Sequence, residues 1–155
     1  MGNDIIRKFV EIWGVEQDPK LASTEEIDSA EKHLGFALPK EYIELVTKYG
    51  AVYCPNLLDQ IVELEAEIPD VQNFSLPSEM IEQTQMYTQA GMPEGFLAFA
   101  SDCMGNMFCY EVSELKNSKT AGIWFFDHDF CEIEKINENI NEWLSSYIEL
   151  SAANK

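Results

Sequence analysis

The chain has 155 residues, a length typical of one domain with its own hydrophobic core, and its 46% hydrophobic content excludes an intrinsically disordered chain. Asp and Glu number 28 against 10 Lys and Arg, which gives a formal net charge of −18. This negative field repels phosphate backbones and anionic lipid headgroups, so it argues against direct binding to nucleic acid or to a membrane surface and favours a cationic partner. Solubility alone is the competing explanation of the charge.

Targeting and redox signals indicate a cytoplasmic protein. No apolar run reaches the ~20 residues of a membrane-spanning helix, and residues 1–15 include Asp4 and Glu11 instead of an apolar secretory segment. The cysteines lack the CxxC spacing of redox or zinc sites, so we expect reduced thiols, most of them small core residues. They are Cys54, Cys103, Cys109 and Cys131.

Three helices are predicted in the N-terminal third of the chain. The first has apolar residues at i, i+4, i+7 and i+8 and ends at Gly14. A capping box of Ser23 and Glu26 begins the second, and Gly35 ends it. Pro39 is expected at the first position of the third helix, which should pack against the second as a helical hairpin. The apolar residues of the first helix are Ile5, Phe9, Ile12 and Trp13.

The rest of the chain predicts a short strand, a helix, an antiparallel meander and a final helix. Ile61–Leu64 is the short strand, Ser78–Ala90 the helix, and the last helix begins near Asn137 or Asn139. Because helices lie at both ends and no βαβ rhythm appears, we predict one α+β domain over residues 1–155, with a central, mainly antiparallel sheet flanked by helices at both termini. The expected meander strands are 96–100, 106–112, 121–126 and 130–136.

Several landmarks occur in a characteristic order along the chain. They are Leu34-Gly35, Leu38-Pro39, Tyr49-Gly50, Asp102-x-x-Gly105-Asn106 and Trp124-x-x-Asp127-His128. In this order they resemble the SUKH superfamily, which unites fungal cell-wall-synthesis regulators with bacterial immunity proteins, from about residue 26 to 150. The acidic stretch 56–72 departs from the pattern. The resemblance implies an α+β fold with a largely antiparallel sheet, no cofactor and, for most bacterial members, neutralisation of a toxin.

The resemblance and the charge together give the leading hypothesis, a non-catalytic immunity protein. It would bind a cognate protein toxin with a cationic active-site surface, such as a nuclease, and acidic side chains would steer the encounter. The alternative is a regulatory or scaffold protein of the fungal type. The predicted partner-binding residues are Glu63, Glu65, Asp102, Asn106, Asp127, His128 and Asp129.

Two turns invite a chemical interpretation. Asp127, His128 and Asp129 could hold a metal or tune a general base, but a zinc site would also need His33 or Cys131 in reach. The competing interpretation is a β-turn whose Asp side chains accept hydrogen bonds from nearby amides. Nucleophilic catalysis by Cys131 with His128 as its base is not expected. In an extended strand, the two side chains would point to opposite faces, roughly 10 Å apart.

Residues 102–106 lack the acidic spacing of a calcium loop and predict a hairpin turn with a positive φ at its glycine.

Overall fold

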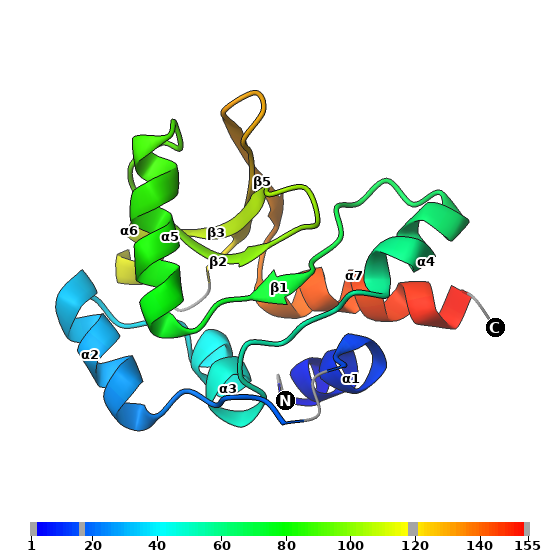
Figure 1. Cartoon of the computed structure of the whole chain (residues 1–155), viewed down its shortest axis with the longest axis horizontal. Coiled ribbons are helices and arrows are strands. Elements are labelled where there is room, and N and C mark those ends of the chain that lie inside the picture. The colour runs from blue at the N-terminus through cyan, green and yellow to red at the C-terminus, as the bar shows by residue number, and fades with distance from the viewer. Residues whose placement is uncertain (1–2, 16–17, 118–120, 154–155) are drawn as a thin grey trace.

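The computed structural model describes residues 3–15, 18–117 and 121–153 as seven helices and five strands (Figure 1). The helices are α1 (Asn3–Trp13), α2 (Thr24–Leu34), α3 (Lys40–Lys48), α4 (Leu57–Leu64), α5 (Pro77–Gln89), α6 (Val112–Asn117) and α7 (Ile140–Ala153). The strands are β1 (Asn73–Phe74), β2 (Phe96–Ser101), β3 (Met107–Glu111), β4 (Ile123–Asp127) and β5 (Glu132–Asn137). The predicted α+β class is confirmed.

Local end signals place α2 as predicted. Ser23 Oγ accepts a hydrogen bond from the Glu26 amide at 3.1 Å, and Glu26 Oε1 accepts one from the Ser23 amide at 3.3 Å, so both halves of the capping box form. At the other end Gly35 has φ 85° and donates its amide to the Glu31 carbonyl at 2.8 Å. Pro39 stands one position earlier than predicted, before the first turn of α3.

The predicted α2–α3 hairpin is wrong. α2 packs against α5, and α3 packs against α1, as Figure 1 shows. The buried face of α2, Ile27 and Ala30, is therefore covered mainly by a helix far along the chain. Helix-end signals identify where a helix stops, but they carry no information on which surface will bury its apolar face.

The predicted strand Ile61–Leu64 is also wrong, because these residues form the second half of α4. The buried residues Leu57, Gln60 and Ile61 follow helical i, i+3, i+4 spacing, and α4 packs beside α7. A four-residue apolar run cannot distinguish a strand from a helix by its period. Strand β1 and the short α6 were not predicted. The turn expected at 117–119, between the predicted strands 106–112 and 121–126, falls mostly outside the described residues.

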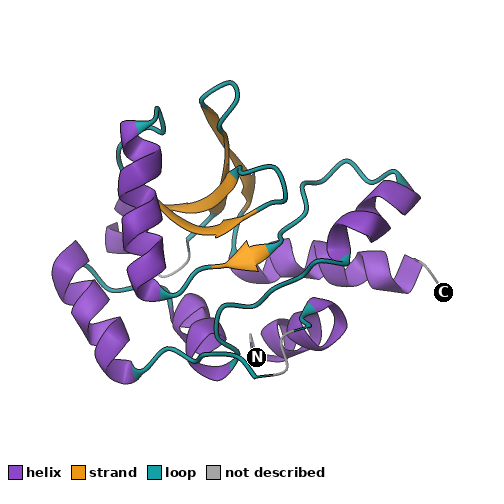
Figure 2. Ribbon diagram, in the orientation of Figure 1, coloured by secondary structure: helices purple, strands orange, loops and turns teal. Residues whose placement is uncertain are grey.

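The strands form one antiparallel sheet in the order β1-β2-β3-β4-β5. Its two faces bury different clusters. Phe99, Phe108 and Tyr110 pack on one face in the main core with Trp143 of α7, and the Phe99 and Tyr110 rings stack at 4.2 Å. The other face holds a smaller cluster around Met107, Cys109 and Phe126. Figure 2 shows the helices arranged around this sheet.

Each fully buried aromatic side chain of this kind stabilises the fold by roughly 1.5–3 kcal/mol, so the core holds the sheet as a rigid platform.

None of the described helices combines the length and apolar composition of a membrane-crossing segment.

Candidate functional site

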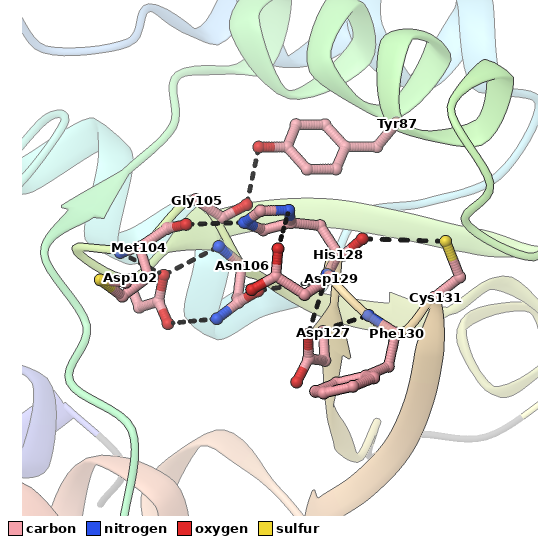
Figure 3. Close-up of polar contacts among 10 residues, drawn as sticks. All are labelled: Tyr87, Asp102, Met104, Gly105, Asn106, Asp127, His128, Asp129, Phe130 and Cys131. Carbon is pink, nitrogen blue, oxygen red and sulfur yellow. Dashed lines mark hydrogen bonds and ion pairs between the residues drawn. The ribbon is translucent and has the colours of Figure 1, made fainter.

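Two hairpin turns meet at one end of the sheet. Alternate strands of an antiparallel meander run in the same direction, so the turn after β2 and the turn after β4 project from the same end. Figure 3 shows these turns, which contain Asp102, Asn106, Asp127, His128 and Asp129. The structure thus brings together the five partner-binding residues that were predicted in the C-terminal half of the chain.

The β2–β3 turn is organised by Asp102. Its Oδ1 accepts hydrogen bonds from the amides of Met104 and Asn106, both at 2.8 Å, and its Oδ2 accepts one from Asn106 Nδ2 at 2.9 Å. Gly105 has φ 87°, as the sequence predicts for this hairpin turn. Asp102 is only 7% exposed, so its carboxylate shapes the turn more than it faces the surface.

The β4–β5 turn follows the same logic. Asp127 Oδ1 accepts from the Asp129 amide at 2.9 Å and from the Phe130 amide at 3.4 Å, which confirms the β-turn interpretation. The turn continues through Cys131, which has φ 53°, so β5 begins at Glu132 and not at Phe130 as predicted. His128 and Cys131 therefore do not lie on an extended strand, and the Cys131 thiol contacts the His128 carbonyl at 3.8 Å.

Asn106 and His128 lock the two turns together. Asn106 Oδ1 accepts a hydrogen bond from the His128 amide at 3.0 Å. The His128 ring makes a second contact with the β2–β3 turn, where its Nε2 lies 2.7 Å from the Met104 carbonyl oxygen. Because a carbonyl only accepts, Nε2 carries the hydrogen in this contact. The other ring nitrogen, Nδ1, lies 3.4 Å from Asp129 Oδ1.

Helix α5 supports the turns from one side. The Tyr87 hydroxyl donates to the Gly105 carbonyl at 2.8 Å, and burial, reinforced by the charge of Asp102, raises the pKa of this hydroxyl. Just beyond α5, Gly91 lies against the Cys131 thiol so closely that a Cβ there would be 2.8 Å from Sγ. The turns are consequently held at three levels, by their own Asp residues, by each other and by α5.

Apolar side chains are exposed around this rigid pair. Met86 is 59% exposed and Met104 68%, and both line a hollow of about 470 Å³ with Tyr87 and His128. Phe130 is 74% exposed and lies outside this hollow, beside Asp127 in the β4–β5 turn (Figure 3). We call Met86, Met104, His128, Asp129 and Phe130 the turn-pair surface. Sequence reasoning missed its apolar members, because exposure of a Met or Phe has no local signature.

Glu63 and Glu65 lie elsewhere. Both are exposed at the C-terminal end of α4, where Glu65 has φ 54°. Figure 1 shows α4 beside α7, away from the β4–β5 turn. They contribute to the overall negative field but do not join the turn-pair surface.

The structure does not support a metal site at Asp127–Asp129. Within the described ranges, no three His, Cys, Asp or Glu residues lie close enough together to hold a metal ion. His33 is on α2, far from the turns in the fold. The thiols Cys54 and Cys109 are buried, as predicted, while Cys103 is partly buried and Cys131 is exposed. Burial raises the pKa of Cys103 to about 11 and that of Cys54 to about 12, so neither thiol is a ready nucleophile.

Comparison with known proteins gives one family. The model of the SMI1/KNR4 family (SUKH-1) matches residues 21–146, close to the span of the resemblance noted in the sequence. The match begins before α2 and ends within α7, so it includes both turns and the whole sheet. No curated protein matches the chain.

Proposed function

The chain belongs to the SMI1/KNR4 (SUKH-1) family, and from this membership we propose that it is a cytoplasmic immunity protein that binds and neutralises a cognate toxin. The family is generally non-catalytic. Neutralising a toxin by binding requires a binding surface and no reaction chemistry. The observation that carries the proposal is the turn-pair surface, a rigid, partly apolar and acidic projection.

The turn-pair surface has the properties of an interface centre. Exposed Met and aromatic side chains are enriched where proteins bind each other, and Met adapts its shape to a partner. Preorganisation by Asp102 and Asn106 lowers the entropy cost of binding. Phe130 and Met104 would act as apolar anchors, and the Asp129 side chain, 70% exposed, would meet a cationic group.

The net charge of −18 supports a cationic target. A nuclease carries positive charge where it holds phosphate, so an acidic inhibitor would approach that cleft under electrostatic steering and occlude it. Glu63 and Glu65 would act in this long-range field and not at the contact itself.

Family membership equally supports a second candidate, a regulatory or scaffold protein that binds an endogenous partner without inhibiting it. The two differ in genetic context and in effect. A toxin gene next to this one favours immunity, whereas a partner that keeps its activity in the complex favours scaffolding.

Growth rescue tests the proposal. The chain would be expressed beside the toxin encoded by the neighbouring gene, and survival scored. Rescue and stable complex formation are expected. The variant Phe130→Ala with Met104→Ala should weaken binding about tenfold or more, as loss of interface anchors does. Val62→Ala is the matched control, since Val62 is 66% exposed on α4. Unchanged affinity of the double variant for the toxin would exclude the turn-pair surface as the interface.

A further inference from the structure

β5 is the open edge of the sheet. It pairs with β4 alone, and no hydrogen bond among the described residues joins its outer side. The opposite edge is covered, because Tyr53 bridges Asn73 and the Phe74 amide donates to the Val52 carbonyl at 3.0 Å. Every second residue of this six-residue strand therefore points its backbone N–H and C=O away from β4, and these unpaired groups form a template for another strand.

The side chains of β5 divide by charge between the two faces of the sheet. Glu132 and Glu134 alternate with Ile133 and Lys135, so the two carboxylates share one face. Lys135 is neutralised on the other face, where its Nζ lies 3.3 Å from Glu114 and 3.4 Å from Glu138. The face that carries Glu132 and Glu134 is acidic, and its carboxylates are two residues apart.

A groove runs beside this acidic face. One hollow, of about 400 Å³, is lined by Phe125, Asp127, Glu132, Ile133 and Glu134. A second, of about 460 Å³, shares Phe125 and Glu134 with the first and reaches Trp143 of α7 and Glu67 before β1. The groove thus has aromatic side chains at its base and carboxylates on two sides. Among the described residues that line it, Lys135 is the one cation, and it is already paired with Glu114 and Glu138.

We propose that β5 and this groove bind an extended segment of the partner protein that carries Lys or Arg at every second position. The segment would add as a sixth strand to β5, and its basic side chains would meet Glu132 and Glu134 as cross-strand pairs. The inference rests on the proposed binding function and names the part of the partner that is recognised. A second copy of this chain is a poor partner for this edge, because pairing of its own β5 with β5 would bring the Glu132 and Glu134 carboxylates of the two copies close together.

The probe is a synthetic peptide of alternating Lys and Val, added to the ¹⁵N-labelled full chain at low ionic strength. The expected result is slower hydrogen exchange and shifted resonances at the amides of 132–137. A peptide of the same composition with its lysines clustered at one end should leave those amides unprotected. Glu132→Gln with Glu134→Gln should weaken binding about three- to tenfold, the loss of two cross-strand ion pairs.

Glu25→Gln with Asp28→Asn is the matched control, because it removes the same charge from exposed positions of α2 and should leave binding unchanged. Equal weakening by both double variants, no protection of β5, or no binding at millimolar peptide would each overturn the proposal. The experiment measures protection of β5 only, so its result tests the β5 proposal separately from the immunity function, which growth rescue tests.

Discussion

Asn106 and His128, which belong to different hairpin turns, are joined side chain to backbone: Asn106 Oδ1 accepts the His128 amide at 3.0 Å. The same Asn106 donates through Nδ2 to Asp102 at 2.9 Å. One amide side chain therefore uses its acceptor for one turn and its donor for the other. Removing it should separate the turns while leaving the sheet intact.

Asn106→Ala should lower the free energy of unfolding by about 1–3 kcal/mol, because it leaves the buried Asp102 carboxylate and the His128 amide with fewer hydrogen-bond partners. Denaturant unfolding measures this loss, and hydrogen exchange should be faster at His128. Asn56→Ala is the control, since Asn56 makes no side-chain cap bond. An equal loss in the two variants would refute the role of Asn106.

Gly105→Ala should cost more stability than Gly35→Ala. Both glycines have φ between 85° and 87°, so both variants pay about 1 kcal/mol for a left-handed alanine. At Gly35 a Cβ would meet nothing within 4 Å, whereas at Gly105 it would lie 3.3 Å from His128 Nε2. The contact should add about 1 kcal/mol. Thermal unfolding in a His128→Ala background checks this, because the excess should disappear there.

Asp70→Asn should stabilise the protein at neutral pH. Asp70 is 5% exposed, its Oδ2 has no hydrogen-bond partner among the described residues, and burial raises its pKa from the ordinary value of an aspartate. A carboxyl with a raised folded pKa destabilises the fold above that pKa, and this cost disappears as the pH falls towards the unfolded value. We expect a gain of about 1 kcal/mol at neutral pH.

The gain from Asp70→Asn should shrink on acidification, because protonation makes the native carboxyl neutral as well. Urea unfolding across the acidic range measures the difference between variant and native protein. A difference that stays constant with pH would show that packing, and not charge, is responsible.

Asp129→Lys should slow association with the partner about threefold or more at low salt, through loss of local steering at the turn-pair surface. Stopped-flow mixing measures the rate. Asp59→Lys, on exposed α4 surface, reverses the same charge away from the site. If both slow association equally, only the global charge matters.

Local chemistry explains what could be predicted. The capping box of α2, the positive φ of Gly105 and the Asp127 turn all depend on bonds between residues at most four positions apart, so each is visible in a short stretch of sequence. The helical character of Ile61–Leu64 depends on Leu57, which lies outside this short apolar run, so the run alone does not reveal it.

By itself, the sequence determined the α+β class, the antiparallel meander and the acidic charge, since alternation, turn residues and composition are local or additive properties. Only the tertiary structure decided that the two turns interlock through Asn106 and His128, that α2 packs on α5, and that Glu63 and Glu65 lie apart from the turn pair. It also exposed Phe130 and left β5 open at the sheet edge. These features depend on contacts between distant segments, where many pairings satisfy the same local pattern and only the best burial of apolar surface selects one.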